Sequence, residues 1–556
     1  MRSVMTAGEA LKRTHVAAYN CSYLPVDHKR CFDEAMYILL CGTGVGFSCE
    51  KQYVDKLPTV PLLEDSDKII TVEDSKEGWC EAYKLLISRL YAGTIPKWDV
   101  SLVRPAGAPL KTFGGRASGP GPLIDLFQYT VNKFSNAQGR QLSPIECHDI
   151  MCKIGEVVVV GGVRRSAMIS LGDLGDYNHA TAKAGAWWEN HGERALANNS
   201  AVYNSKPSIG EFMKEWLDIY NSHSGERGIF NREASQKQAA KWGRRDINTD
   251  YGTNPCSEII LKPYQFCNLS TVVVSPDDNL ETLKLKVRLA TIMGTMQSTL
   301  TDFPYLRDIW KKNTEQERLL GVSMTGILDN HILRGSSTSH NLRSVLEQLR
   351  DVARDTNKEW AEILDVPKSA AITCVKPEGT VSQLTQTSSG IHAGHAPYYI
   401  RRIRQDKKDP LTQFLIDQGV SYEDCVMKPD QTAVFSFPQH SPGFTRKDIN
   451  AIEHLNIWLA YQRHWCEHKP SVTISVKDHE WMEVGAWVYE HFDECTGISF
   501  LPDDGGTYRQ APYEDINQEQ FNNMNMPVIK WSLFSEDRDN VEGAQMLACT
   551  AGQCEI

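Results

Sequence analysis

The sequence lacks any long run of apolar residues. No segment reaches the roughly 18 to 20 consecutive apolar residues that a membrane-spanning helix needs. The first residues, MRSVMTAGEALKRTHVAAYN, also lack the apolar stretch of a signal peptide. Both absences predict a cytoplasmic protein without a membrane partner. The chain has 556 residues, of which 41% are hydrophobic, and this is enough to bury a large core.

An excess of positive charge is also missing. The formal net charge is -11, which disfavours proteins that coat nucleic acids or bind anionic membranes, because both need broad surfaces of Lys and Arg. We therefore expect no direct binding of nucleic acid. Any site for a phosphate group must be a local arrangement of a few residues.

Cysteine is sparse and irregularly spaced. Fifteen cysteines in a chain of this length are too few for a disulfide scaffold, and most are expected to be buried thiols. Structural zinc sites use cysteine pairs two to four residues apart, and only Cys549 and Cys554 come close. No second pair lies nearby, so we expect no metal ion held directly by the protein. A dithiol on a polar, flexible tail is better suited to reducing a buried disulfide.

Short apolar runs alternate with amphipathic stretches of helical length. The runs are 157–160, 259–261, 271–274 and 370–375, and the predicted helices are 77–92, 144–157, 209–222, 280–301 and 343–364. This alternation predicts an α/β protein with much parallel sheet. The last fifty residues are polar and broken by Gly and Pro, which is typical of a mobile segment.

The segment NPCSE at 254–258 combines an amide, a thiol and a carboxylate. Pro255 predicts a turn that presents the thiol, and alternating spacing in an extended segment places Asn254, Cys256 and Glu258 on one side. A thiol, a general base and an orienting amide could then face one pocket. Cys267 follows eleven residues after Cys256, a distance compatible with a loop that returns to the same site. Two ordinary buried cysteines near a turn are the alternative.

Several motifs together resemble ribonucleotide reductases, and most closely the adenosylcobalamin-dependent, monomeric type that reduces ribonucleoside triphosphates. In chain order the motifs are AAYNCSYLPV around Cys21, CGTGVGFSCE at 41–50, DIMCKIGEVVVVGGVRRSAMISLGD at 149–173, NPCSEI at 254–259, VKPEGTVSQL at 375–384 and the terminal CTAGQC. The resemblance runs along the whole chain. It implies a ten-stranded α/β barrel of two antiparallel five-stranded halves, with effector-binding elements, in residues 1–504. Residues 505–556 would form a C-terminal segment that ends in a mobile redox tail.

The resemblance also implies a role for each active-site residue. Cys256 would carry the thiyl radical that takes the 3′ hydrogen of the substrate. Glu258 would accept the proton of the 3′ hydroxyl, and Asn254 would help to position the substrate. Cys21 and Cys267 would be the reducing dithiol that ends as a disulfide. The tail pair Cys549 and Cys554 would reduce that disulfide again, with thioredoxin or a similar dithiol protein as the final reductant.

Two further segments resemble nucleotide-binding elements of the family. One is its phosphate-binding turn at the start of a helix, formed here by Pro377, Glu378, Gly379, Thr380, Val381 and Ser382. The other is the loop that links a bound effector to base selection, formed here by Gly162, Val163, Arg164, Arg165 and Ser166. A simple strand-to-helix connection and solvated arginines are the respective alternatives. The effector would be a deoxynucleoside triphosphate, with or without Mg²⁺.

Members of this family differ in how they generate the radical. The chain lacks a C-terminal glycyl-radical motif, and Gly497 to Leu501 is followed by Pro502 rather than by the Tyr-Tyr pair of subunit-dependent enzymes. Tyr398 and Tyr399 sit in a segment that also looks like the cobalamin-dependent group. Adenosylcobalamin is therefore the expected cofactor.

The family usually has about a hundred residues before the segment that matches the beginning of this chain. The sequence is thus expected to start at the first barrel strand, without an N-terminal ATP-binding activity domain. A split gene with a separate N-terminal fragment, a trimmed reading frame and a naturally small enzyme are the alternatives.

Three other functions are also compatible with the sequence. One is a ribonucleoside-diphosphate reductase that depends on a separate radical-generating metal subunit. Another is a catalytically silent nucleotide-binding homologue, which would not need all five cysteines. A thiol oxidoreductase unrelated to nucleotides is the third, and the phosphate-type turn disfavours it.

Overall fold

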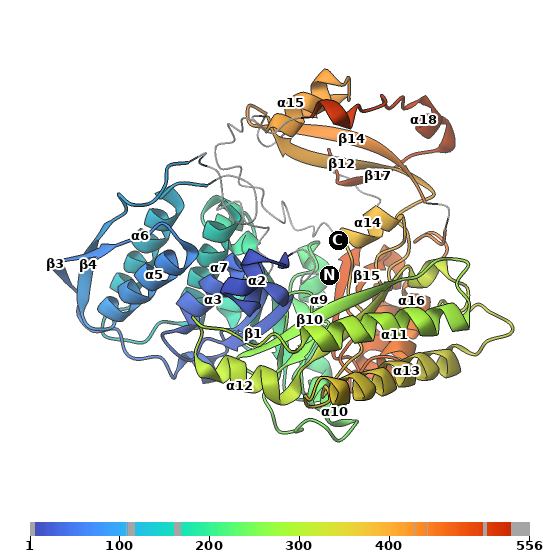
Figure 1. Cartoon of the computed structure of the whole chain (residues 1–556), viewed down its shortest axis with the longest axis horizontal. Helices are drawn as coiled ribbons and strands as arrows, with labels where there is room; N and C mark the ends of the chain where they lie inside the picture. The colour runs from blue at the N-terminus through green and yellow to red at the C-terminus, as the bar shows by residue number, and fades with distance from the viewer. Residues whose placement is uncertain are drawn as a thin grey trace.

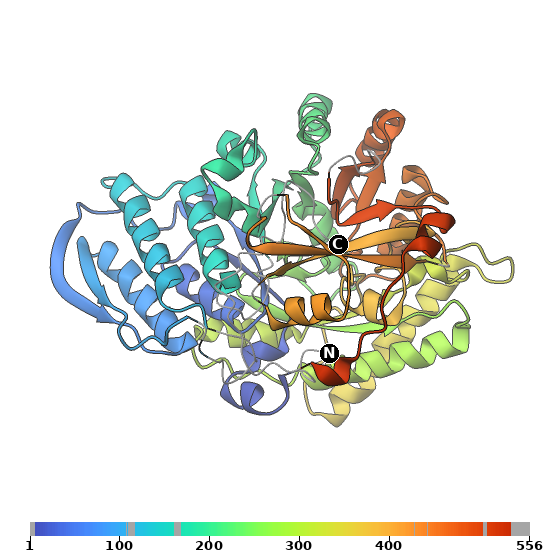
Figure 2. The same ribbon diagram turned by 90° about the horizontal axis from the view of Figure 1, so that it is seen from above.

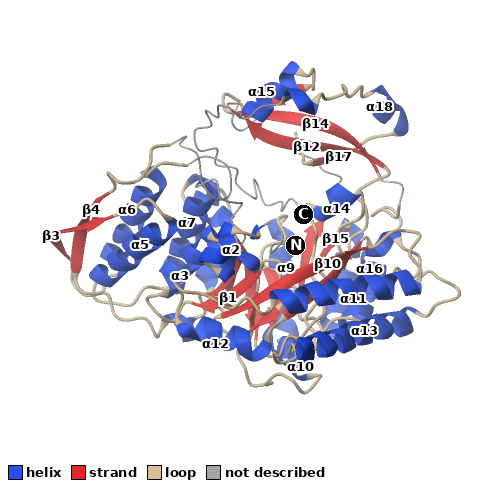
Figure 3. Ribbon diagram, viewed as in Figure 1, coloured by secondary structure: helices blue, strands red, loops and turns tan. Residues whose placement is uncertain are grey.

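A barrel of strands surrounded by helices forms the largest part of the protein (Figure 1). The computed structural model describes residues 6–106, 108, 117–160, 168–407, 409–426, 429–441, 443–503 and 509–534. Figure 3 shows the barrel strands at the centre of the molecule, with long helices along their outer side. Within the described residues, no helix is long and apolar enough to cross a membrane.

One half of the barrel consists of parallel strands in the order β1, β2, β5, β6 and β7. Their bounds are β1 (Cys21–Pro25), β2 (Gly44–Ser48), β5 (Met168–Asp173), β6 (Ala197–Tyr203) and β7 (Gly228–Asn231). The helices of this half are α3 (Cys31–Leu40), α7 (Pro144–Val160), α8 (Tyr177–Ala180) and α9 (Ile209–Ser222).

The other half runs antiparallel to the first, because β10 pairs with β1 and β16 pairs with β7 in antiparallel register. Its strands are β10 (Gln265–Val273), β11 (Leu320–Thr325), β15 (Thr473–Val476) and β16 (Gly497–Pro502). The helices in this part of the chain are α10 (Arg232–Ala240), α11 (Leu280–Gln297), α12 (Asp308–Glu317), α13 (Leu342–Ile363), α14 (Val381–Thr385), α16 (Ala451–His464) and α17 (Trp481–Glu490).

The segment 371–375 joins the two ends of this nine-stranded sheet. A parallel bridge pairs Val322 of β11 with Thr373, and another pairs Val375 with Pro470, shortly before β15. The segment is therefore a tenth strand that belongs to the second half. This confirms the predicted α/β barrel of two antiparallel five-stranded halves.

Two smaller units flank the barrel. The first, at the left in Figure 1, contains α4 (Lys51–Val54), the parallel pair β3 (Glu64–Thr71) and β4 (Thr94–Asp99), α5 (Lys76–Leu90) and α6 (Gly121–Asn136). The second is an antiparallel sheet of β12 (Tyr398–Asp406), β13 (Tyr422–Asp424), β14 (Thr432–His440) and β17 (Tyr513–Asp515), with α15 (Pro410–Asp417) and α18 (Gln518–Asn523). Figure 2 shows this sheet lying over one end of the barrel. The described part of the segment after residue 504 thus contributes β17 to this sheet, and the division at 504 stays a prediction.

Most of the predicted elements are confirmed. The five amphipathic stretches correspond to α5, α7, α9, α11 and α13. A capping box formed by Ser208 and Glu211 fixes the start of α9, and one formed by Asn279 and Thr282 fixes the start of α11. The runs 259–261, 271–274 and 370–375 contribute to β9, β10 and the tenth strand.

Two local predictions are wrong. The run 157–160 is the last turn of α7 rather than a strand, because a short apolar run on a buried helix has no period that distinguishes it from a strand. The chain also does not start at the first barrel strand. Residues Glu9–Arg13 form α2 and His15–Ala18 form a 3-10 helix, and β1 begins only at Cys21.

A hairpin of β8 (Gly252–Thr253) and β9 (Ile260–Leu261) lies against the inner side of the barrel wall. A Cβ atom added to Gly46 of β2 would lie 1.7 Å from the carbonyl oxygen of Thr253, and one added to Gly44 would lie 2.9 Å from the ring of Pro255. The alternating glycines of β2 therefore make room for the loop inside the barrel.

We predict that Gly46→Ala strongly destabilises the protein, because the added methyl group collides with backbone rather than with a movable side chain. The free energy of unfolding should fall by about 3 kcal/mol or more, measured from the midpoint of urea unfolding. Gly121→Ala, at the start of α6, is the matched control because nothing lies within 4 Å of its Cβ position. An unchanged midpoint for Gly46→Ala would contradict the close approach.

Candidate active site

The loop between β8 and β9 carries Cys256 into the barrel. Pro255 and Cys256 form a turn, and Ser257 has a φ of 63°, a left-handed conformation that is unusual for a residue with a side chain. The N–H of Ser257 donates to the carbonyl of Asn254 at 2.8 Å. The predicted turn at Pro255 is therefore confirmed, but the extended spacing is wrong, because this turn reverses the chain.

Asn254 and Glu258 nevertheless meet beside the same thiol. Nδ2 of Asn254 donates to Sγ of Cys21 at 3.2 Å, and its Oδ1 accepts from the N–H of Ile259 at 2.9 Å. Sγ of Cys21 lies 3.8 Å from Oε1 of Glu258. Both polar residues are buried. The turn thus places an amide and a carboxylate next to a cysteine from a distant part of the sequence.

Cys21 and Cys267 are direct partners in the antiparallel register of β1 and β10. Directly opposed residues of an antiparallel pair point to the same face, with Cα atoms about 4.5 to 5.5 Å apart, which suits a disulfide. Both are buried free thiols. They belong to the same apolar cluster as Ile259, which follows the loop. The barrel therefore holds two buried thiols at directly opposed positions of neighbouring strands.

Burial dominates the electrostatics of this group. It raises the pKa of Glu258, while the ammonium of Lys376 and the amide of Asn254 act in the opposite direction. Burial, together with the nearby carboxylate of Glu258, raises the pKa values of the Cys21 and Cys267 thiols well above their ordinary range. The two thiols are thus protonated at neutral pH and hold hydrogens to donate.

Oε2 of Glu258 is buried and has no hydrogen-bond partner among the described residues. A buried acceptor without a partner is unfavourable, so this oxygen is available to a hydroxyl group that enters the site.

Two lysines near the carboxylate of Glu258 were not predicted from the sequence. Lys376 directly follows the tenth strand. Burial acts to lower its pKa, but the neighbouring Glu378, Cys256, Glu258 and Cys21 raise it above the ordinary value. Lys469 donates from Nζ to Oγ of Ser257 at 2.8 Å. Lys469 belongs to no motif identified in the sequence, and Lys376 lies in the motif VKPEGTVSQL without a role of its own being predicted. Only closure of the barrel brings them to the loop.

The predicted phosphate turn lies between the tenth strand and α14. The side chain of Glu378 is buried and accepts from Oγ1 of Thr271 at 2.5 Å, and its N–H donates to Oγ of Ser389 at 2.8 Å. Gly379 and Thr380 are exposed, and α14 begins at Val381. The turn therefore presents a helix start at the surface, as the sequence predicts.

Two cavities reach these groups. One of about 640 Å³ is lined by Gly379 and Ser382 of the phosphate-type turn, together with His392. The other, of about 780 Å³, is lined by Cys256 and by residues of β16. Thr473 and Leu501 line both cavities. The thiol and the turn thus face adjoining rather than identical spaces.

Several predicted site residues lie outside the described residues. These are the effector-loop residues Gly162, Val163, Arg164, Arg165 and Ser166, and the tail cysteines Cys549 and Cys554.

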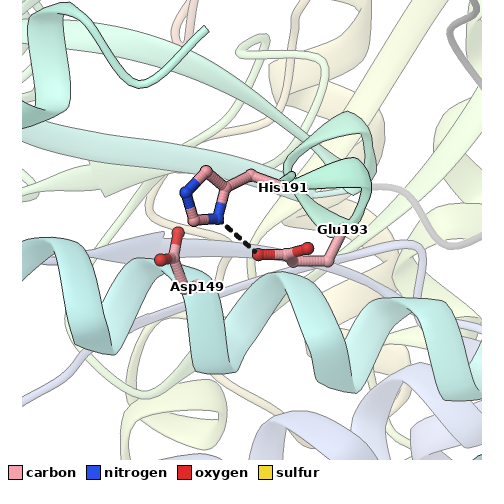
Figure 4. Close-up of side chains that lie close together, drawn as sticks. All are labelled: Asp149, His191 and Glu193. Atoms are coloured by element: carbon pink, nitrogen blue, oxygen red, sulfur yellow. Dashed lines mark ion pairs between the residues drawn. The ribbon is translucent and has the colours of Figure 1, made fainter. Parts of the chain in front are cut away.

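Asp149, His191 and Glu193 form a cluster that has the residue types of a metal site (Figure 4). Asp149 already pairs with Lys133 at 2.7 Å and with Arg194 at 2.8 Å, and His191 lies 3.4 Å from Glu193. Because Lys133 and Arg194 already lie beside the carboxylate of Asp149, binding of a metal ion there is disfavoured. We interpret the cluster as an ion-pair network that ties α7 to the segment before β6.

We predict that a mild thiol oxidant such as diamide links Cys21 to Cys267, because their register places the two sulfur atoms on one face. Mass spectrometry of a non-reduced digest should yield the linked peptide. Buried Cys374 of the same cluster should remain free, and Cys267→Ser should leave Cys21 unlinked. A link between Cys21 and Cys374 would contradict the proposed pairing.

Known proteins with related sequences align with most of this chain. A family model described as the insertion domain of B12-dependent ribonucleotide reductase matches residues 48–134, which include the flanking unit of β3, β4 and α5. The adenosylcobalamin-dependent ribonucleoside-triphosphate reductase of Euglena gracilis is 29% identical over 93% of this chain and 70% of its own length. The protein of the same name from Lactobacillus acidophilus is 30% identical over 90% of this chain and 72% of its own length.

A solved structure shares the fold. The crystal structure of a B12-dependent (class II) ribonucleotide reductase matches with a TM-score of 0.76 and 25% sequence identity, over 93% of this chain and 82% of that one.

Proposed function

The chain belongs to the adenosylcobalamin-dependent ribonucleoside-triphosphate reductases, and we propose a role in that reaction for each residue of the barrel site. The enzyme converts ribonucleoside triphosphates to 2′-deoxyribonucleoside triphosphates, the precursors of DNA, and it depends on adenosylcobalamin. The observation that carries the proposed roles is the meeting of Asn254, Glu258 and Cys21 at the turn that bears Cys256.

In the proposed sequence, a thiyl radical on Cys256 takes the 3′ hydrogen of the ribose. Glu258 accepts the proton of the 3′ hydroxyl, for which its partnerless Oε2 is suited. Cys21 and Cys267 supply one proton with which the 2′ hydroxyl leaves as water and one hydrogen that becomes bonded to the 2′ carbon, and they supply two electrons as they become a disulfide. Cys256 then returns the hydrogen to the 3′ carbon. The substrate gains the two electrons that the dithiol loses.

The second cavity could receive the part of the cofactor that must approach the thiol. Its volume of about 780 Å³ is near the upper end of the range for small-molecule sites. It brings Trp187, Ile498 and Phe500 together with Cys256, so a large, partly apolar group can reach the thiol. Bound there, adenosylcobalamin would supply the radical equivalent by homolysis of its Co–C bond. No protein ligand to the metal is required, because the corrin holds the cobalt.

The remaining roles follow the family pattern. Pro377 to Ser382 would bind the substrate phosphates, and the effector loop around Arg164 and Arg165 would couple a bound deoxynucleoside triphosphate, with or without Mg²⁺, to base selection. Cys549 and Cys554 would reduce the Cys21–Cys267 disulfide and be reduced in turn by thioredoxin or a similar dithiol protein. Such chemistry suits the reducing cytoplasm, and a separate N-terminal fragment remains a candidate partner.

A reductase that uses a separate radical-generating metal subunit is the second candidate. Its radical relay would need a tyrosine pair at the end of β16, where Pro502 and Asp503 stand instead. Tyr398 and Tyr399 lie on β12 of the second sheet rather than on a barrel strand. These positions favour the cobalamin-dependent reaction.

We predict that the purified protein forms deoxyribonucleotide from CTP, with dithiothreitol and an effector nucleotide, only when adenosylcobalamin is present. Chromatography of the products provides the measurement, with CDP as the competing substrate. Cys256→Ser should reduce turnover to background, whereas Cys374→Ala, at a buried cysteine without an assigned role, should retain it. Turnover without the cofactor, or preference for CDP, would favour the second candidate.

We also predict a specific pH dependence of kcat/KM. Glu258 must be ionised to act as a base, so activity falls as the pH drops through its pKa, which burial raises above the ordinary value of 4.5. Lys376→Met removes the charge that lowers this pKa, so the acid limb should move to higher pH. The exposed Lys312→Met should leave the limb in place. A limb that moves to lower pH in Lys376→Met would contradict the assignment of Glu258.

A further inference from the structure

Ser257 is the strained residue of the loop. It is a non-glycine residue with a φ of 63°, and a residue with a side chain adopts this left-handed conformation only when its surroundings hold it there. Its neighbours in the chain are Cys256 and Glu258. Any relaxation of Ser257 toward an ordinary conformation would rotate both neighbours away from their present directions.

Lys469 contacts both the strained residue and the residue that follows it. Nζ donates to Oγ of Ser257 at 2.8 Å, and the backbone N–H of Lys469 donates to the carbonyl of Glu258 at 3.1 Å. The carbonyl of Lys469 in turn accepts from the N–H of Val375 in the tenth strand at 3.2 Å. The loop is thereby tied to the strand that closes the barrel.

Phe230 and Gly497 surround the place where Nζ of Lys469 contacts Ser257. Nζ of Lys469 lies 4.6 Å from the centre of the Phe230 ring, an arrangement favourable for a cation. A Cβ atom at position 497 would lie 3.1 Å from Oγ of Ser257 and 3.3 Å from Nζ of Lys469. Gly497 of β16 therefore leaves the space in which the two side chains meet.

We propose that Lys469 is a positioning residue that holds Ser257 in its left-handed conformation and thereby fixes the directions of Cys256 and Glu258. The proposal rests on the proposed radical role of Cys256 only for its catalytic consequence. The mechanical part, a clamp on a strained turn, stands on the contacts of the loop alone.

The charge state of Lys469 is compatible with this role. Burial lowers its pKa to about 7, against the opposing effect of the Glu258 carboxylate. The amine and the ammonium both carry N–H groups that can donate to Oγ of Ser257. The clamp therefore holds on either side of neutral pH.

Hydrogen–deuterium exchange of the peptide that contains residues 254–259 tests the clamp in the cofactor-free protein. Lys469→Met should raise its exchange rate by about tenfold, because the left-handed turn loses its restraint. Adding Ser257→Gly should return the rate of Lys469→Met toward that of the wild type, because glycine adopts this φ without strain. Lys469→Arg, which keeps a donor, should exchange more slowly than Lys469→Met.

Ser257→Ala provides an independent variant if Lys469→Met does not fold, because it removes only the acceptor of the contact. It should raise the exchange rate in the same peptide and leave α13, far from the loop in the chain, unchanged. Exchange that is unaffected by Lys469→Met or Ser257→Ala, or that Ser257→Gly fails to restore, would overturn the clamp.

Turnover with CTP and adenosylcobalamin tests the catalytic consequence separately. It should fall at least tenfold in Lys469→Met and recover in the double variant with Ser257→Gly. If the wild type shows no turnover while the exchange pattern holds, the proposed function fails and the clamp stands. If the double variant recovers the exchange rate without turnover, the positioning role is overturned.

Discussion

Closure of a ten-stranded barrel around a polar loop is the constraint on which the rest of the structure depends. The hairpin of β8 and β9 needs space beside a wall that would normally be filled by side chains, and Gly44 and Gly46 of β2 provide it. Asn254 accepts from the N–H of Ile259 and donates to Cys21, and these hydrogen bonds satisfy much of the loop's polarity. A turn with little secondary structure of its own is rigid because the barrel encloses it.

Enclosure also sets the chemistry of the site. Away from water, a thiol is held protonated and a carboxylate resists ionisation, as the raised pKa values of Cys21, Cys267 and Glu258 show. Both effects serve a reaction in which thiols give up hydrogen and a carboxylate takes a proton. The same exclusion of water protects a sulfur radical from side reactions.

The sequence was sufficient for the barrel class, for most long helices and for the residues of the loop, because each depends on local pattern or on a short motif. It failed where tertiary context overrides local preference. The run 157–160 reads as a strand but continues α7, and the spacing within the loop reads as extended although Pro255 and the left-handed Ser257 turn it. Lys376 and Lys469 were not predictable, since the tenth strand brings them to Glu258 only when the barrel closes.

The turn explains why Cys256 and Glu258, two residues apart in the sequence, lie in different surroundings. In an extended segment Cys256 and Glu258 would share one face, and one cavity would have to hold both substrate and cofactor. The left-handed Ser257 instead leaves the thiol on the larger cavity, while Glu258 stays buried beside Cys21. In the proposed reaction, Cys256 would receive a radical from one side and act on a ribose at the other. The strained Ser257 would keep these two sides apart, which is the conformation that the proposed restraint by Lys469 would preserve.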